Sequence, residues 1–337
     1  MKDLIKIQQK LIPQVIELMT KRYLILHQIS LNESIGRRAL ASKLNVTERV
    51  VRSEVEFLKE QGFINIDTSG MSITDDGEEM IKNLKEVIND IMGLSTLEEK
   101  LKAKLGVKKV LLVSSDYKED VLKNVARCGA EYFLSILKDE DVVAITGGST
   151  VREFANSIKT DKKYPNVRVV PARGSMGKDI EYQSNNVVAT VSKKLNSKYK
   201  LLHIPDELGE EAMKTIVQEP EIKKALDYMK KTDILVFGIG KADEMAKKRR
   251  IEEDKLDYII KKGGVGEAFG HFFDKDGEIV FKLNTVAIDL ETFKNIKEKI
   301  AICSGVNKVD ALIALTNINK NIVVVTDEDS ANEILKR

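Results

Sequence analysis

The segment DVVAITGGSTVREFANSI, residues 141–158, reads directly from strand through turn into helix. Its apolar run at 142–145 shows no polar alternation, which is typical of a strand buried on both faces of a parallel sheet. Beyond the turn, apolar residues recur at the spacing of one helix face, and they are Val151, Phe154, Ala155 and Ile158. This order predicts a strand–helix unit of an α/β fold.

The turn inside this segment, Thr146 to Thr150, is suited to binding an anion. Its two glycines let the backbone approach a bound group closely, and Ser149 or Thr150 is predicted to cap the helix. The N–H groups and the positive dipole end at a helix start attract phosphate. Many strand-to-helix turns carry the same residues for turn geometry alone, so this turn by itself leaves a purely structural role open.

Short Val- and Ile-rich runs alternate with amphipathic segments from residue 107 onward. Strands that stay apolar throughout and are separated by helices indicate a parallel sheet covered on both faces. The runs that we assign to strands are 107–113, 141–146, 167–172, 200–205, 233–240, 285–289, 299–303 and 321–326.

The length, charge and composition of the chain limit the classes of protein to which it can belong. Its 337 residues are expected to form roughly two domains, and a net charge of +2 does not describe a polycation. The two cysteines lie in apolar surroundings and favour buried thiols, while three scattered histidines argue against a structural zinc site. No apolar run approaches the length of a membrane span, and the first ten residues lack the apolar core of a signal peptide. We therefore expect a cytoplasmic protein that makes no membrane contact and needs neither metal nor cofactor.

Residues 36–62, GRRALASKLNVTERVVRSEVEFLKEQG, have the layout of a helix-turn-helix. A short helix at 38–44 leads into a tight turn at 45–47, where Thr47 is placed to cap a second helix. The segment at 63–77 reads as two short strands joined by a turn, like the wing of a winged helix. The second helix is predicted to bury Val50, Val51, Val55 and Leu58.

The outer face of this second helix is the candidate DNA-contacting surface, because the first turns of a recognition helix meet base edges in the major groove. Arg49 and Arg52 are candidates for contacts with guanine O6 and N7 or with phosphate. Residues 1–62 hold eleven Lys/Arg against seven Asp/Glu, an excess that suits this role. The alternative is a small three-helix unit whose basic residues are simply exposed. The candidate DNA-binding residues are Thr47, Glu48, Arg49, Arg52 and Ser53.

The predicted organisation has three parts. A winged helix-turn-helix domain occupies 1–90, a helical linker at 78–105 overlaps its end, and a ligand-binding domain occupies 106–337. The linker carries apolar residues at helical spacing, so it either pairs with its counterpart in a second subunit or packs on its own domain.

Several anion-binding groups follow predicted strands of the ligand-binding domain. In an open α/β sheet, ligands lie beyond the carboxyl ends of the strands, so most of these groups are expected at one edge. Two separated sets of cationic or N–H donors favour a ligand with two phosphates. The groups are the turn at 147–150, Arg173, Gln183, the glycines at 238–240 with the basic run 247–250, the glycine loop at 266–270, and Lys308.

The motifs VVAITGGST, PARG, HIPDEL, GIG, GEAFG and NIVVVTDE, in this order and together with Gln183, resemble the SorC family of sugar-responsive transcriptional repressors. Within that family, the resemblance implies a repressor of glycolytic genes. It also implies a Rossmann-like, doubly wound effector domain similar to glucosamine-6-phosphate deaminase and ribose-5-phosphate isomerase. Fructose 1,6-bisphosphate or a related sugar phosphate would be the effector ligand, and a homodimer or homotetramer would bind operator DNA.

The resemblance also assigns residues. It places Gly148, Ser149 and Thr150 on one phosphate, with Ser149 replacing a threonine that is common in the family. The family's arginine pair after the GIG strand aligns with Lys248 and Arg249, whereas the pair in this chain is Arg249-Arg250. Arg249 is therefore the preferred candidate for a contact with the effector ligand, and Lys248 is the second candidate. The sugar and the other phosphate would be surrounded by Arg173, Gly174, Gln183, Glu267 and Lys308, with Glu267 accepting from sugar hydroxyls.

Two alternatives remain at this stage. The fold type also hosts phosphosugar isomerases and deaminases, in which Glu267 or Asp243 would serve as the acid or base. A fused DNA-binding module argues against that reading, because an enzyme of central metabolism does not need one. The other alternative is a repressor whose ligand is a monophosphate or an unphosphorylated sugar, which the two-site anion pattern disfavours.

Overall fold

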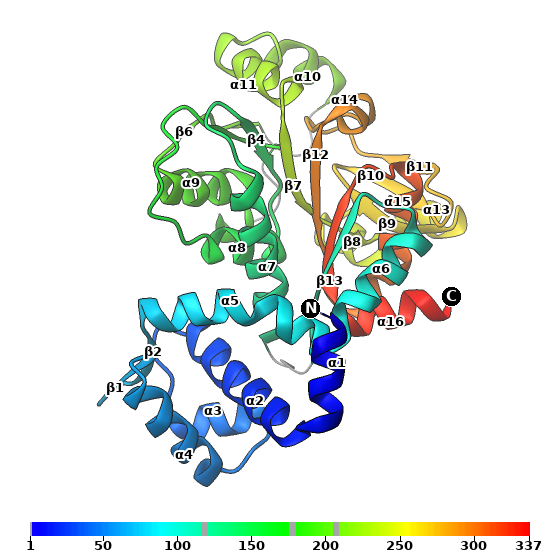
Figure 1. Ribbon diagram of the computed structural model, residues 1–337. Coiled ribbons are helices and arrows are strands. Elements are labelled where there is room, and N and C mark those ends of the chain that lie inside the picture. Colours follow the sequence, from blue (N-terminus) through cyan, green and yellow to red (C-terminus); the bar gives the residue numbers. More distant parts are fainter. Residues whose placement is uncertain (1, 116–119, 175–179, 205–208) are drawn as a thin grey trace. The chain divides into compact units, whose positions relative to one another are not determined.

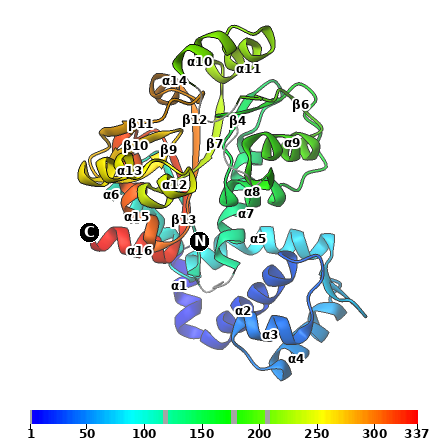
Figure 2. The same ribbon diagram turned by 180° about the vertical axis from the view of Figure 1, so that it is seen from behind.

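The computed structural model describes residues 2–115, 120–174, 180–204 and 209–337. The chain forms two compact units, which Figures 1 and 2 show from opposite sides. The first unit comprises Met1–Leu97 together with Ser114–Asn124, and the second comprises Glu98–Val113 together with Val125–Arg337. Among the described residues, no helix combines the length and the apolar character needed to span a membrane.

The first unit is built from helices and one β-hairpin. Asn45, with a left-handed φ of 52°, ends the first helix of the predicted helix-turn-helix, and Thr47 caps the second. The two strands of the predicted wing pair antiparallel, from Ile64 opposite Ile73 to Asp67 opposite Gly70. Both the helix-turn-helix and the wing are thus confirmed. The elements are α1 (Lys2–Leu11), α2 (Pro13–Ser30), α3 (Arg37–Leu44), α4 (Glu48–Glu60), β1 (Ile64–Asp67), β2 (Gly70–Ile73) and α5 (Asp75–Ile91).

Two helices occupy the segment expected to be a helical linker. Helix α5 ends at Ile91 and α6 (Leu94–Leu105) starts after Gly93, whose φ of 77° suits a residue without a Cβ. Thr74 caps α5 by accepting a hydrogen bond from the amide of Gly77 at 3.1 Å. The segment at 78–105 is therefore helical but interrupted.

A seven-stranded parallel sheet forms the centre of the second unit, in the order β3-β13-β12-β7-β4-β5-β6. Figure 1 shows β4, β7, β12 and β13 side by side. The predicted parallel sheet is confirmed. Its strands are β3 (Lys109–Val113), β4 (Val142–Ile145), β5 (Arg168–Pro171), β6 (Lys198–Tyr199), β7 (Ile234–Gly238), β12 (Glu298–Ile302) and β13 (Val323–Asp327). The helices of this unit are α7 (Val121–Ile136), α8 (Ser149–Ser157), α9 (Ser184–Leu195), α10 (Glu210–Ile216), α11 (Pro220–Lys230), α12 (Ala242–Lys248), α13 (Glu253–Lys261), α14 (Leu290–Asn295), α15 (Val309–Ile318) and α16 (Glu328–Lys336).

The strand order reverses between β4 and β7. From β4 the chain proceeds outward through β5 and β6, and from β7 it proceeds the other way through β12 and β13. Ligands of open α/β sheets bind beyond the carboxyl ends of the strands at such a switch point. The loops after β4, β5, β7 and β12 are therefore the first place to look for a site.

A second, antiparallel sheet was missed by the sequence analysis. It has the order β11-β10-β9-β8, with β8 (Gly240–Lys241), β9 (Gly264–Ala268), β10 (His271–Asp274) and β11 (Ile279–Lys282). The glycine loop predicted at 266–270 is wrong, because Gly266 to Ala268 belong to β9. Only Phe269 and Gly270, with φ values of 55° and 80°, form the turn.

Two predicted strands are also wrong. Residues 285–289 contribute only an isolated bridge between Ala287 and Arg173. The strand predicted at 200–205 is displaced to the two residues of β6, and residue 205 lies outside the described part of the chain. Most apolar side chains of both runs are buried although these residues form no strand there, and an apolar pattern alone cannot distinguish such a segment from a strand.

A lysine is fully buried near the start of β12. The Nζ of Lys299 donates to the carbonyl of Ile296 at 2.6 Å and to that of Lys294 at 3.3 Å, so it satisfies carbonyls at the end of α14. Burial lowers the pKa of the Lys299 ammonium to about 8; the charge of Lys108 acts in the same direction and Glu298 opposes it.

We expect this lysine to make stability depend on pH in the alkaline range. Between about pH 8 and the ordinary lysine pKa of about 10.4, the unfolded chain holds a proton that the folded chain has released. The free energy of unfolding of the wild type, relative to Lys299→Met, should therefore rise across this range by about 1.4 kcal/mol per pH unit. Urea unfolding of both proteins, followed by circular dichroism because the chain has no tryptophan, measures this difference. A difference that stays constant from neutral to alkaline pH would contradict the assignment.

Candidate functional site

The turn after β4 presents the start of helix α8. Gly148 stands at the N-cap with a φ of 106° and no side-chain cap, so the prediction that Ser149 or Thr150 caps the helix is wrong. A positive φ is easily reached only by glycine, which is why Gly148 takes this position. Ser149, exposed, and Thr150, buried, open the helix, where amide groups have no acceptor within the helix. The turn thus presents N–H donors and the positive end of a helix dipole.

The start of α9 is pressed against this turn. A Cβ on Gly147 would lie 2.3 Å from the carbonyl oxygen of Tyr182, so only glycine permits this approach. The amide of Gly148 donates to the same oxygen at 2.8 Å. Gln183 follows as the N-cap residue of α9, and the hydroxyl of Ser184 donates to the carbonyl of Arg173 at 2.9 Å. The loops after β4 and β5 are thereby joined through the first residues of α9.

A buried ionic cluster lies beyond β5. Glu267, on β9, accepts a hydrogen bond at Oε1 from Arg249 Nη2 at 2.7 Å and another from the amide of Gly270 at 2.7 Å. Arg173 Nη1 lies 3.7 Å from the same oxygen. The side chains of Arg173, Arg249 and Glu267 are only 6%, 2% and 4% exposed.

Arg173 and Arg249 both direct their guanidinium groups to the Glu267 carboxylate, in a part of the domain that is largely withdrawn from water. Guanidinium groups bind phosphate oxygens with two parallel hydrogen bonds.

The structure places the three basic residues at and after the end of α12 differently. Arg249 points into the buried cluster, whereas Lys248, in the last turn of α12, is exposed. Arg250 is also exposed and has a left-handed φ of 54°. Of these three side chains, only that of Arg249 lies in the cluster.

The remaining candidates lie on neighbouring loops. The amide of Gly174 donates to the carbonyl of Val286 at 2.8 Å, so it is already engaged. Lys308 ends a short 3-10 helix, η3 (Val306–Lys308), on the loop after β12. That loop is fixed by the amide of Gly305, which donates to Asp327 Oδ2 at 2.8 Å.

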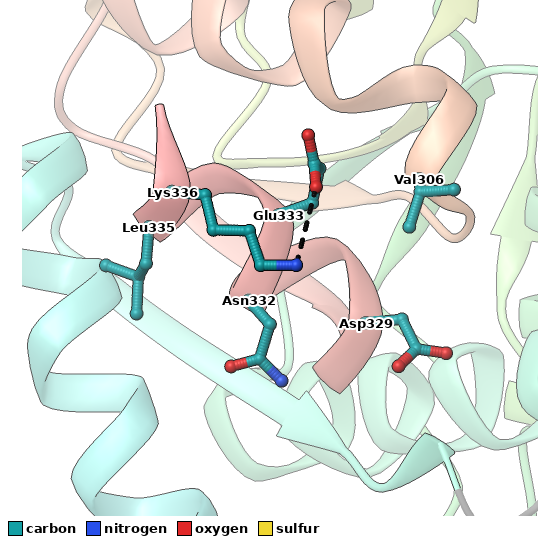
Figure 3. Close-up of a pocket in the computed structure, with 6 residues that line it drawn as sticks. All are labelled: Val306, Asp329, Asn332, Glu333, Leu335 and Lys336. Carbon is teal, nitrogen blue, oxygen red and sulfur yellow. Dashed lines mark ion pairs between the residues drawn. The ribbon is translucent and has the colours of Figure 1, made fainter.

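A separate depression of about 610 Å³ lies along α16 (Figure 3). It is lined by Val306, Asp329, Asn332, Glu333, Leu335 and Lys336. Lys336 forms an ion pair with Glu333 at 3.9 Å, and the carboxylates of Glu333 and Asp329 make the depression unsuited to an anionic ligand. We therefore do not place the ligand there.

The candidate DNA-contacting residues lie along the start of α4. Thr47 Oγ1 accepts from the amide of Val50 at 3.4 Å, and Arg49, Arg52 and Ser53 are exposed side by side on the outer surface. Glu48 is half-buried and lies 3.4 Å from Arg38 Nε in an ion pair. The exposed arginines stand where a recognition helix meets DNA.

The buried face of α4 differs from its prediction at two positions. Val50 is only half-buried, while Glu54 is buried and forms ion pairs with Lys21 at 2.7 Å and Arg22 at 2.9 Å. Burial raises the pKa of Glu54, but hydrogen bonds from the two cations lower it by more, so the net direction is downward. Arg22 also stacks on Phe57, with its guanidinium carbon 3.6 Å from the ring centroid. This cluster fixes α4 to α2, and no local spacing in the sequence signals it.

Comparison with known proteins identifies both units. The family model of the CggR N-terminal DNA-binding domain matches residues 18–88, and the Sugar-bind model of a sugar-binding domain matches residues 89–336. The chain is 40% identical to the central glycolytic genes regulator of Priestia megaterium and 37% identical to that of Bacillus subtilis. Each alignment covers 100% of this chain and 99% of the relative.

Solved structures show the same fold. A SorC family transcriptional regulator from Enterococcus faecalis has a TM-score of 0.67 and 28% identity, covering 71% of this chain and 99% of that one. The full-length sorbitol operon regulator SorC from Klebsiella pneumoniae has a TM-score of 0.67 over 89% of this chain and 94% of that one. At 20% identity, the latter likeness supports the fold alone.

These matches decide whether the chain is a transcriptional regulator or an enzyme. Asp243, one of the two residues considered as an acid or base, is half-buried and lies 3.5 Å from Lys241 in an ion pair. Glu267, the other, is held by Arg249 in the cluster. The chain belongs to the family of the central glycolytic genes regulators, within the SorC family of sugar-binding transcriptional regulators, and not to a family of enzymes.

Proposed function

We propose that this chain represses genes of central glycolysis by binding operator DNA through α4. Fructose 1,6-bisphosphate or a related sugar phosphate would weaken that binding. The observation that supports the ligand class best is the pair of buried guanidinium groups, Arg173 and Arg249, in the same domain as the glycine-led start of α8. Helix-start amides and paired guanidinium groups are two independent kinds of phosphate-binding group.

The positions of the individual residues support the following roles. The first turn of α8 would bind one phosphate through the amides of Ser149 and Thr150, and Gly148 would allow the phosphate to approach the backbone closely. Arg173 and Arg249 would bind the other, with Lys308 contributing from the loop after β12. Glu267 would orient both arginines and accept from a sugar hydroxyl. Gln183 and Gly174, on the loops beside Arg173, would line the site.

Regulation would work by linkage between two binding equilibria. The sugar phosphate prefers a state of the protein that binds DNA less well, and the operator affinity falls by that difference. Couplings of this kind are typically worth about 1–3 kcal/mol, or roughly 5–150-fold. Binding as a homodimer or homotetramer would match two helix-turn-helix units to two half-sites.

The test uses a labelled DNA duplex selected from a random pool by the purified protein. Fluorescence anisotropy should show the affinity for this duplex falling by roughly 5–150-fold at saturating fructose 1,6-bisphosphate. Fructose 6-phosphate should act less strongly, because it offers a single phosphate to the two sets of donors. If neither compound changes DNA affinity or assembly state, the proposal is wrong.

A further inference from the structure

Arg152 lies next to the proposed phosphate turn and is held by an acidic partner. It is the fourth residue of α8, and its Nη1 lies 2.8 Å from Glu181 Oε2. Its guanidinium also stands over the ring of Tyr182, 5.4 Å from the centroid. Glu181 and Tyr182 belong to a short 3-10 helix, η2 (Ile180–Tyr182), which leads into Gln183. No residue of this group was singled out from the sequence.

Helix geometry directs this side chain toward the phosphate turn. Side chains of an α-helix lean toward its N-terminus and cover the preceding turn, so Arg152 overlies Gly148 and Ser149. The contacts agree, because the carbonyl of Tyr182 accepts the amide hydrogen of Gly148 at 2.8 Å while the ring of Tyr182 faces the guanidinium. The Arg152–Glu181 ion pair is therefore adjacent to the amides that open α8.

Arg152 is suited to exchange Glu181 for a phosphate. The side chains of Arg152 and Glu181 are 33% and 69% exposed, and ion pairs in contact with solvent contribute little to stability. A phosphate dianion carries more charge than a carboxylate and accepts two parallel hydrogen bonds from a guanidinium. Until a phosphate arrives, the Glu181 carboxylate occupies the guanidinium group that the phosphate would bind, so Glu181 competes with the phosphate for Arg152.

We propose that Arg152 is a further phosphate-binding residue of the effector site and that Glu181 is the internal anion which holds it until the ligand arrives. This inference rests on the proposed sugar-phosphate site. In the exchange, Arg152 releases the Glu181 carboxylate to water and takes up a phosphate oxygen pair, and no covalent bond changes. The pair thereby favours phosphorylated over unphosphorylated sugars.

Under this proposal Arg152 increases the affinity for the phosphate and Glu181 decreases it, and the test measures both effects. Isothermal titration calorimetry with fructose 1,6-bisphosphate should show Arg152→Gln weakening binding by about tenfold, because a charged hydrogen-bond donor is lost. Glu181→Gln should tighten binding by about threefold, because the competing carboxylate is gone. In the double variant the tightening should disappear, since Glu181 competes for Arg152.

A purely structural role of the Arg152–Glu181 ion pair predicts a different result. If the ion pair only fixed η2 against α8, both single variants would lose affinity, and that result would overturn the inference. Glu131→Gln is the control, because Glu131 is itself 45% exposed and pairs with Arg127 on α7 at 3.0 Å, and this variant should bind as the wild type does. Circular dichroism checks that each variant is folded.

The outcomes separate this inference from the proposed function. If the wild type fails to bind fructose 1,6-bisphosphate, the proposed function fails and the inference with it. If the wild type binds but both single variants match it, or both weaken, the inference alone fails.

Discussion

Replacing Arg249 with alanine is expected to abolish the response to fructose 1,6-bisphosphate while DNA binding without ligand is retained. The guanidinium is nearly fully buried and hydrogen-bonded to Glu267 at 2.7 Å. Its loss removes one of the two guanidinium groups that pair with Glu267 and leaves a carboxylate that repels phosphate. Truncating one partner of a buried charge pair costs about 2–5 kcal/mol, which corresponds to roughly 30- to 5000-fold in ligand affinity. Calorimetric titration of the variant with the bisphosphate measures the loss directly.

The neighbouring lysine supplies a matched control. Lys248→Ala removes one positive charge from an adjacent but exposed position, so its affinity for the bisphosphate should stay within about threefold of the wild type. Arg249→Lys keeps the charge but loses the paired donors, and it should fall between the two. Equal losses in Lys248→Ala and Arg249→Ala would show that general surface charge, not the cluster, attracts the ligand.

The choice between Lys248 and Arg249 shows how much of this site could be predicted from the sequence. Both residues follow the same glycine-containing strand end and share a basic run, so the pattern supported either one. The decisive partner, Glu267, is supplied by a strand of the antiparallel sheet. That sheet escaped prediction because β8 has only two residues and β9 contains two glycines, which depress strand propensity. Without it, Glu267 could be interpreted as a hydroxyl acceptor but not as the residue that holds Arg249.

Local features of the fold were easier to predict from the sequence. The apolar run before Thr146 and the helical spacing after it are encoded by adjacent residues, and they became β4 and α8. The cap was misassigned because two glycines followed by Ser149 and Thr150 are compatible with more than one helix start. Only the backbone, with Gly148 at a φ of 106°, decides among them. Contacts such as Gly147 against Tyr182 depend on how distant loops pack, and no spacing in the sequence encodes them.

Operator binding should be lost when Arg49 and Arg52 are both replaced with alanine. The two side chains are exposed on the first turns of α4, where a recognition helix meets the major groove. A bidentate contact with a base is worth about 1–3 kcal/mol, so removing two such contacts in each half-site should weaken binding at least ~100-fold. Because neither side chain contributes to the buried core, the fold should be unchanged. A gel-shift titration on the selected duplex, together with circular dichroism, tests both statements.

The salt dependence of the same variant separates the two kinds of contact that an arginine makes. An arginine that binds a phosphate releases counterions, so its removal should reduce the slope of log affinity against log salt by about one per contact. An arginine that reads a base edge leaves the slope largely unchanged and relaxes sequence preference at one position. Lys59→Ala, at the far end of α4 and also exposed, is the control, and it should retain nearly full affinity. Undiminished binding by the double variant would remove α4 as the recognition helix, because the remaining candidates, Thr47, Glu48 and Ser53, carry no positive charge.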